Sequence, residues 1–239
     1  MISEFSRTEL LFGTEKFNNL KNTHIAVFGI GGVGGYAVEA LARSGIQKID
    51  LIDNDTISLT NINRQIIALH STLGEYKVDV MKKRILDINP NAQVKVFKCF
   101  YLPQNQNLFN FSEYDYVIDA VDTVTAKIQL IIQAKSAGTK IISCMGTGNK
   151  LNPTLFEISD ISKTSVCPLA RVMRQECKKR GIKDVKVLFS KEKPKKITYN
   201  EDSEKKSNGY APAGCAFVPS VAGLIIAGEV IKDLCNIKS

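Results

Sequence analysis

Short apolar runs alternate with longer amphipathic stretches over the first 150 residues of the chain. The runs are typical of buried strands, and they lie at His24 to Phe28, Lys48 to Asp53, Tyr116 to Ala120 and Lys140 to Cys144. A further strand is predicted at Gln93 to Phe100, where polar and apolar residues alternate. The stretches between them predict helices that end near Ser44, span Glu75 to Asn89 and span Val124 to Ala137. This alternation favours an α/β fold with a Rossmann-like, doubly wound, mainly parallel sheet.

The pattern changes beyond residue 150, where we expect an antiparallel C-terminal extension of the sheet. Its predicted elements are strands at Thr154 to Ile161 and Val185 to Ser190, a helix from Pro168 to about Arg180, a charged loop over Lys191 to Gly209, and a closing helix over Pro219 to Leu234. Gly223 and Gly228 in the closing helix are expected to let another backbone approach closely.

The segment before the first strand, Ser6 to Lys21, predicts a short helix with an arm. Arg7 lies near its start. Taken alone, Arg7 is expected to be a surface residue. A cation on an arm outside the main fold is also placed to reach a neighbouring subunit.

Composition is that of an ordinary globular protein, with 44% hydrophobic and 23% charged residues among 239. The first 22 residues are polar and of mixed charge, which does not match a signal peptide. The most apolar run, Ala216 to Ile231, is interrupted by Pro219 and Glu229 and is too short to span a bilayer. We therefore expect a cytoplasmic protein with no membrane partner.

Six cysteines are scattered along the chain and form no CxxC pair, so the zinc-ribbon signature is absent. Most are expected to be buried small hydrophobes, although one catalytic thiol is left open. The net charge is +8, and Lys178 to Lys206 alone contributes 11 − 5 = +6. Such clustering predicts a polyanionic partner, nucleic acid first, against the alternative of a solvated lysine-rich face.

A glycine turn, Gly29-Ile30-Gly31-Gly32-Val33-Gly34, follows the first predicted strand and opens the first long helix. One glycine must allow the tight turn, one lets backbone approach phosphate, and one lets the helix pack on the strand. Asp53 ends the second strand 19 residues beyond Gly34, the spacing of a carboxylate that binds ribose hydroxyls. Together these features predict a nucleotide site.

Two cations indicate that the ligand of this site is ATP and not a dinucleotide such as NAD. Arg64 and Lys77 lie just past Asp53, and paired cations suit a triphosphate whose leaving group gains charge. The alternative is that Arg64 caps a loop and Lys77 is a solvated helix residue. Asp119 and Asp122 end a later strand, and Asp122 suits Mg²⁺, which takes one or two carboxylates plus phosphate oxygens; it could instead cap the next helix.

These motifs resemble those of the ubiquitin-activating-enzyme-like adenylating superfamily. The resemblance covers nearly the whole chain and rests on FGIGGVG at Phe28 to Gly34, DNDTISLTNINRQ at Asp53 to Gln65, Lys77, and DAVDT at Asp119 to Thr123. A branch that dehydrates threonylcarbamoyladenosine in tRNA is most similar, through SRTELLFG at Ser6 to Gly13, PLARVMR at Pro168 to Arg174, and AFVPSVAGLIIAGEVI at Ala216 to Ile231.

The resemblance implies that ATP and Mg²⁺ activate the carboxylate of a threonylcarbamoyl group in a tRNA anticodon loop, and that the adenylate then cyclises. The implied nucleotide-site residues are Gly29, Gly31, Gly32, Gly34, Asp53, Asp55, Asn61, Arg64, Gln65, Lys77, Asp119 and Asp122. Among them, Asp53 would bind ribose, Asn61, Arg64 and Lys77 would contact phosphates, and Asp122 would hold Mg²⁺. Arg7 matches an arginine that reaches the partner subunit's triphosphate, which implies a homodimer, and a sulfur-transfer protein partner is left open.

On this basis we assign residues 1–150 to an ATP-binding Rossmann-like core with the N-terminal arm. Residues 151–239 are expected to form a C-terminal portion of the same domain that contacts substrate and the second subunit. One departure is Cys167, which stands where the family commonly has an acid before PLA.

Three other functions compete with a tRNA-modifying enzyme. The first is an adenylyltransferase for a ubiquitin-like sulfur carrier, but its relatives usually carry two zinc-binding CxxC pairs that are absent here. The second is a nicotinamide oxidoreductase, which leaves Arg64, Lys77 and Asp122 unexplained. The third is a non-catalytic nucleotide-binding partner, which the full set of polar residues argues against.

Overall fold

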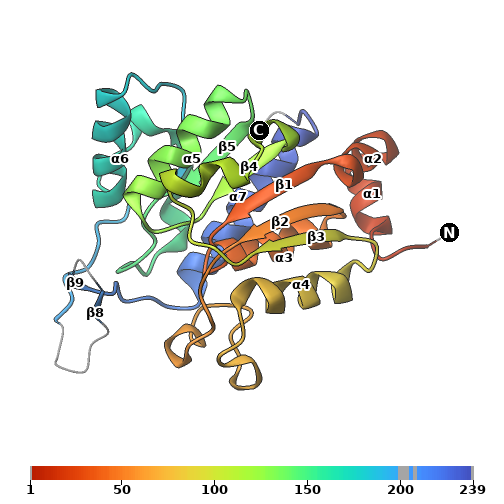
Figure 1. Cartoon of the computed structure of the whole chain (residues 1–239), viewed down its shortest axis with the longest axis horizontal. Coiled ribbons are helices and arrows are strands. Elements are labelled where there is room, and N and C mark those ends of the chain that lie inside the picture. Colours follow the sequence, from red (N-terminus) through yellow and green to blue (C-terminus); the bar gives the residue numbers. More distant parts are fainter. Residues whose placement is uncertain (1, 199–204, 207–208, 238–239) are drawn as a thin grey trace.

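One seven-stranded sheet runs through the molecule in the order β3-β2-β1-β4-β5-β7-β6, shown in the computed structural model of Figure 1. Its strands are β1 (His24–Phe28), β2 (Lys48–Ile52), β3 (Gln93–Phe97), β4 (Tyr116–Asp119), β5 (Lys140–Cys144), β6 (Phe156–Asp160) and β7 (Lys186–Ser190). Neighbouring strands are parallel except β6, which is antiparallel to β7. The expected mainly parallel sheet with an antiparallel C-terminal extension is therefore confirmed.

The structure describes residues 2–198, 205–206 and 209–237. Its α-helices are α1 (Ser6–Phe12), α2 (Thr14–Asn22), α3 (Gly34–Arg43), α4 (Lys77–Ile88), α5 (Val124–Ser136), α6 (Pro168–Lys179) and α7 (Phe217–Leu234). Short 3₁₀ helices lie at Leu59–Asn61, His70–Thr72, Pro103–Leu108, Phe111–Glu113, Pro153–Leu155 and Ile161–Lys163. None of the described helices is long and apolar enough to cross a membrane.

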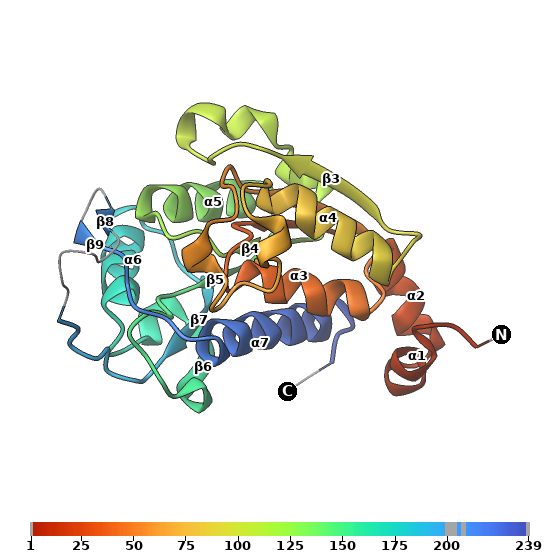
Figure 2. The same cartoon turned by 90° about the horizontal axis from the view of Figure 1, so that it is seen from below.

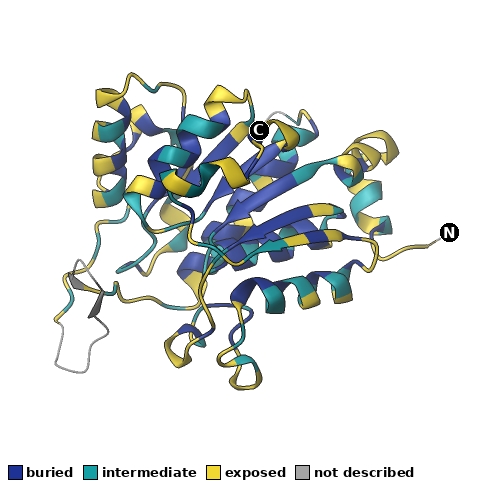
Figure 3. Cartoon of the chain, viewed as in Figure 1, coloured by how far each residue is buried: buried dark blue, intermediate teal, exposed yellow. Residues whose placement is uncertain are grey.

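Helices cover both faces of the sheet, with α3, α4 and α7 on one face and α5 and α6 on the other (Figure 2). Successive side chains of β1 alternate between two cores, because side chains along a strand point to opposite faces. Ile25 and Val27 enter the core beneath α3 and α7, whereas Ala26 and Phe28 enter the core beneath α5. The inner strands β1, β2, β4, β5 and β7 are buried on both sides, which explains their apolar runs, whereas the edge strands β3 and β6 are partly exposed (Figure 3).

Two expectations at the ends of the chain need correction. The N-terminal segment is two helices, α1 and α2, because Gly13 adopts a positive φ of 82° and breaks the predicted single helix. The charged loop from Lys191 to Gly209 contains a short antiparallel pairing of β8 (Lys205–Lys206) with β9 (Gly209–Tyr210). Residues 199–204 and 207–208 of that loop lie outside the described residues.

Close packing of α7 against α3 depends on Gly223. A Cβ atom at Gly223 would lie 2.3 Å from the carbonyl oxygen of Val33 and 2.9 Å from the amide nitrogen of Ala37. The expected close approach is confirmed there. It is wrong for Gly228, where an added Cβ would meet no atom within 4 Å.

The order of strands places a crevice between β1 and β4. The chain leaves β1 for α3 on one face of the sheet and leaves β4 for α5 on the other. Such a reversal separates the two connections at the carboxyl ends of the strands, and ligands of open α/β sheets bind in the gap.

We predict that Gly223→Ala destabilises the fold by about 1–3 kcal/mol, because the new methyl group would force α7 away from α3. Gly228→Ala on the same helix is the matched control, and it should be neutral or stabilising by up to about 1 kcal/mol. Urea denaturation gives the free energy of unfolding of both variants. Equal stability of the two would contradict the packing role of Gly223.

Candidate active site

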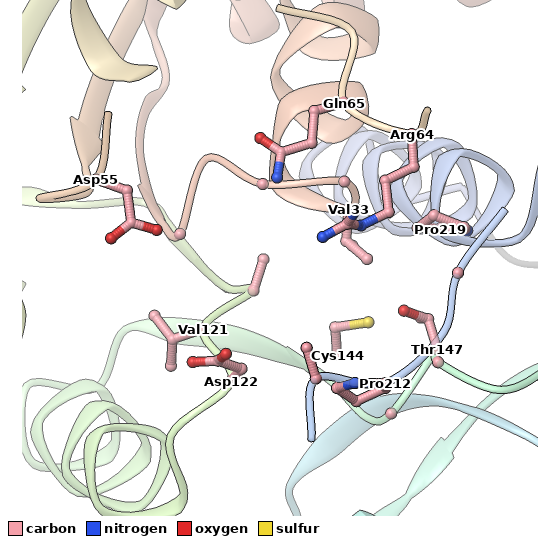
Figure 4. Close-up of a pocket in the computed structure, with 18 of the residues that line it drawn as sticks. Val33, Asp55, Arg64, Gln65, Val121, Asp122, Cys144, Thr147, Pro212 and Pro219 are labelled. Atoms are coloured by element: carbon pink, nitrogen blue, oxygen red, sulfur yellow. The ribbon is translucent and has the colours of Figure 1, made fainter. Parts of the chain in front are cut away.

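A cavity of about 740 Å³ opens at the carboxyl ends of β1, β2, β4 and β5, in the crevice between α3 and α5 (Figure 4). It brings together most of the residues predicted from the sequence, namely Gly29, Gly31, Gly32, Asp53, Asp55, Asn61, Arg64, Gln65, Lys77 and Asp122. Three predicted residues do not line it: Gly34, Asp119 and Arg7.

The glycine turn forms one wall of this cavity. Gly29 has a φ of 90°, and a Cβ at Gly34 would lie 1.8 Å from the carbonyl oxygen of Gly29, so the first turn of α3 packs directly on the end of β1. A Cβ at Gly31 would have only the Gln65 amide nitrogen within 4 Å, at 3.9 Å. No side chain caps α3 and no acid lies in its first turn, so its N-terminal N–H groups suit an anion.

Asp53 is fixed at the base of the turn. Its Oδ2 accepts a hydrogen bond of 2.7 Å from the Ile30 amide, and its Oδ1 accepts one of 2.8 Å from the Asp55 amide. Burial raises the pKa of Asp53 above its ordinary value, against the opposing charge of Lys77. Each carboxylate oxygen still has a lone pair with which to accept a ligand hydroxyl.

Lys77 is buried, with an exposed fraction of 5%, so its interpretation as a solvated helix residue is wrong. Its Nζ contacts Oδ2 of Asp55 at 2.6 Å, and its backbone N–H donates to the Asp55 carbonyl at 3.0 Å. A second backbone contact, the bridge between Thr56 and Tyr76, joins the same two segments. The loop after β2 is thereby attached to the start of α4.

Arg64 lies between two loops on the opposite side of the cavity from Asp122 (Figure 4). Its Nη1 donates to the Thr60 carbonyl at 2.6 Å and to Oδ1 of Asn63 at 2.9 Å. A Cβ at Gly214 would lie 3.2 Å from Cδ of Arg64. The guanidinium therefore does hold its own loop, as the alternative interpretation proposed, and it also lines the cavity.

Two amide side chains, Asn61 and Gln65, line the cavity beside Arg64. Asn61 is buried, and its Oδ1 accepts a hydrogen bond from the Ser58 amide at 3.2 Å. Gln65 is also buried, and its Oε1 has no hydrogen-bond partner among the described residues. That oxygen is itself closed to solvent, and the amide nitrogen of the same side chain lies beside Gly31.

The two acids of the DAVDT segment lie in different surroundings. Asp119 is fully buried away from the cavity, where it contacts Lys127 Nζ at 3.0 Å and accepts a hydrogen bond from Ser143. The expected direct contact of Asp119 with a nucleotide does not fit this position. Asp122 lines the cavity, and no side chain caps α5, whose N-cap is Thr123, so the capping alternative for Asp122 is wrong.

Lys127 was not identified from the sequence. It is fully buried, and its Nζ also donates to the Cys144 carbonyl at 2.7 Å. It thereby links the end of β4 to the end of β5. Asp122 follows β4 in the chain, and the β5–β6 loop follows β5. The signal available was its position eight residues after Asp119, in the first turn of α5.

The far end of the cavity is built by three segments, of which only the start of α6 lies in a motif noted in the sequence, PLARVMR at Pro168 to Arg174. They are the β5–β6 loop, the start of α6, and the segment before α7, and their lining residues include Met145 to Lys150, Cys167 to Leu169, Pro194 and Ala211 to Gly214. Thr147 and Pro212 lie across the cavity from Asp55 (Figure 4). Hydrogen bonds attach the segment before α7 to two other loops. Asn63 Nδ2 donates to the Gly214 carbonyl at 3.0 Å. The Asn149 N–H donates to the Ala213 carbonyl, and the Ala213 N–H donates to Asn149 Oδ1, both at 2.8 Å.

Cysteines at this end are poorly placed as nucleophiles. Burial raises the pKa of Cys144 to about 12, so its thiol remains protonated at neutral pH. Cys167 is buried at the N-cap of α6 and makes no side-chain capping hydrogen bond.

Arg7 is exposed on α1, a helix of seven residues with no buried residue. Leu10 and Leu11 on the same helix are 85% and 79% exposed. The cavity of a single chain therefore lacks Arg7.

Comparison with known proteins places this site in a family. A tRNA threonylcarbamoyladenosine dehydratase of Bacillus subtilis is 47% identical over 98% of this chain and 95% of its own length. The crystal structure of the Escherichia coli tRNA N6-threonylcarbamoyladenosine dehydratase in complex with ATP has a TM-score of 0.86 at 34% identity, covering 98% of this chain and 94% of that one.

A sulfur-carrier enzyme matches less of the chain. The adenylyltransferase and sulfurtransferase UBA4 of Vanderwaltozyma polyspora is 34% identical over 58% of this chain and 31% of its own length. The family model matches residues 5–239, and it is that of the ThiF family. Because that model covers nearly the whole chain, this chain belongs to the ThiF family.

Proposed function

We propose that this chain is an ATP-dependent enzyme that dehydrates threonylcarbamoyladenosine in the anticodon loop of tRNA. A carboxylate oxygen of the threonylcarbamoyl group attacks the α-phosphorus of ATP, and diphosphate leaves. A nucleophile within the same modified nucleoside then attacks the activated carbonyl carbon, and AMP leaves with the former carboxylate oxygen. The product is cyclic threonylcarbamoyladenosine, and no enzyme thiol is needed.

The observation that carries this proposal is identity of 47% with a tRNA threonylcarbamoyladenosine dehydratase over 98% of the chain. That span includes both ends of the cavity: the glycine turn with the loop after β2, and the segments around the starts of α6 and α7. The sulfur-carrier relative matches only 58% of the chain, which makes adenylation of a ubiquitin-like protein the weaker alternative.

Roles for the cavity residues follow from their surroundings. The glycine turn and the start of α3 receive phosphate, and Asp53 accepts hydrogen bonds from the ribose. Asn61, Arg64 and Lys77 contact the phosphates, where cations stabilise the departing diphosphate. Asp119 acts indirectly, because its ion pair with Lys127 supports the segment that carries Asp122.

Magnesium is the second cofactor of the proposal. Among the described residues there is no group of three or more His, Cys, Asp or Glu side chains placed to hold a metal ion. One carboxylate is nevertheless sufficient for Mg²⁺ when a triphosphate supplies further oxygens, and Asp122 lines the cavity. When bound, the ion would neutralise phosphate charge.

We further propose a homodimer in which Arg7 completes the partner subunit's site. Support comes from α1, which buries no residue and exposes Leu10 and Leu11. Two neighbouring exposed leucines form an apolar patch, and contact with a second chain would remove it from water. A C2 dimer would supply Arg7 to both sites equally.

The proposed nucleic-acid surface lies beside the cavity. α6 begins at Pro168 and Leu169 on the cavity wall and carries exposed Arg171 and Lys178 along its length. Its cationic end neighbours exposed Lys183. A tRNA substrate also favours a cytoplasmic location, and docking of a sulfur-transfer protein is a secondary possibility that no feature of the cavity favours.

We predict that Arg64→Ala and Asp122→Ala each reduce ATP–diphosphate exchange, assayed with modified tRNA, by at least about a hundredfold, because the first removes a cation from the phosphates and the second removes the proposed ligand of Mg²⁺. Circular dichroism should show a retained fold. Exchange at the wild-type rate in both variants would contradict the assigned roles, and mass spectrometry of tRNA nucleosides identifies the product.

Mixing variants tests Arg7 in the dimer. Arg7→Ala and Asp122→Ala should each be inactive alone, but co-expressed chains should recover up to about a quarter of wild-type activity, since half of the dimers are mixed and one site in each is intact. Co-expressed Arg64→Ala and Asp122→Ala are the matched control and should recover nothing, because both residues belong to one chain's cavity. Absence of recovery in the Arg7 mixture would contradict a contribution across subunits.

Binding of tRNA should weaken by at least about tenfold between roughly 50 and 200 mM salt, because phosphate contacts release counterions. Substituting Arg171 and Lys178 by Ala should flatten the slope of log Kd against log salt, whereas Lys83→Ala on the distant α4 should leave it unchanged. Filter binding measures Kd, and a salt-independent Kd would point to a protein partner instead.

A further inference from the structure

Three lysines are buried in the described part of the chain, and they differ in their partners. Lys77 contacts Asp55 at 2.6 Å, and Lys127 contacts Asp119 at 3.0 Å. Lys150, which is 3% exposed, forms no ion pair with any described residue. A buried ammonium without a carboxylate is costly, so its retention at a cavity wall points to an anionic ligand.

Lys150 lies in the β5–β6 loop, which lines the cavity and is hydrogen-bonded to the segment before α7. Its Nζ donates one hydrogen bond of 2.7 Å to the Gly146 carbonyl, and both residues line the cavity. An ammonium has three N–H groups, and no other acceptor for Nζ lies among the described residues. Donors therefore remain for a ligand.

Backbone contacts fix the loop that carries Lys150. Asn149 has a positive φ of 59°, rare for a residue other than glycine. It donates its N–H to the Ala213 carbonyl at 2.8 Å and accepts from the Ala213 amide through Oδ1 at 2.8 Å. A Cβ at Gly148 would lie 2.5 Å from Cβ of Pro212, so the loop packs directly on the segment before α7. The ammonium is thus held in place before any ligand arrives.

We propose that Lys150 binds the carboxylate of the threonylcarbamoyl group and holds it for attack on the α-phosphorus. This inference rests on the proposed function. Phosphates already have the start of α3 and Lys77, and Arg64 reaches the segment before α7, where its Cδ would lie 3.2 Å from a Cβ at Gly214. Thr147 and Pro212 lie across the cavity from Asp55, and that side remains for the acyl substrate (Figure 4). A fixed cation there would both recognise the substrate by its carboxylate and orient the attacking oxygen.

The test compares two tRNAs that differ only in the threonylcarbamoyl group. Lys150→Gln removes the charge but keeps an amide that can donate to the Gly146 carbonyl, and Lys150→Arg keeps the charge. Without ATP, wild-type protein and Lys150→Arg should bind modified tRNA more tightly than unmodified tRNA. Lys150→Gln should lose this preference through an increase of about ten- to a hundredfold in Kd for modified tRNA alone.

Three results would overturn the inference. If Lys150→Gln keeps the preference for modified tRNA, the carboxylate is bound elsewhere. An equal loss of affinity for both tRNAs would mean that Lys150 contacts a phosphodiester, and a matching rise in the Kd of ATP would mean that it contacts the nucleotide. Melting temperature checks the fold, and Lys150→Met provides a second neutral variant.

Failure of the proposed function would be seen separately. Wild-type protein that does not convert modified tRNA with ATP and magnesium contradicts the function itself. Wild-type conversion with an unchanged preference in Lys150→Gln contradicts only the role of Lys150.

Discussion

The hydrogen bond from the Ile30 amide to the Asp53 carboxylate joins the glycine turn to the loop after β2. The turn itself tolerates no side chain at Gly34, whose Cβ would overlap the Gly29 carbonyl. Because Asp53 also accepts from the Asp55 amide, the backbone that begins the polar loop is fixed relative to the start of α3. The glycine turn and Asp53 therefore form one rigid unit, and the remaining cavity residues are arranged around it.

Two further attachments extend this unit across the cavity. The Lys77–Asp55 pair fixes the polar loop to α4, and Asn63 fixes its far end to the segment before α7 through Gly214. Arg64 lies between these attachments and is held by its own loop. Preorganised cations stabilise developing charge without reorganising during the reaction, which is what transfer of an adenylyl group from ATP requires. The cavity depends on contacts between segments that are far apart in the sequence.

Local patterns were sufficient to predict the elements of the sheet and the glycine turn, because the burial of a strand and the periodicity of a helix depend on the order of polar and apolar residues within a short segment. They failed at Gly13, where one positive φ splits a helix, and for Asp119, where the acid at a strand end pairs with Lys127 inside the core. The segments around Lys150 and Gly214 also escaped prediction. Their residues carry no motif, and only the fold of distant strands brings them to the same cavity.

The buried pair of Lys127 and Asp119 has a consequence for how this protein can change over time. Both side chains are inaccessible to solvent. Losing either one would leave the other charge unpaired in the core and lower the free energy of unfolding by about 3–5 kcal/mol. Replacement of both by apolar residues of similar volume would cost far less. A lineage that alters one position must therefore pass through an unstable ancestor or alter both together, so descendants of this sequence should show the two positions changing in step.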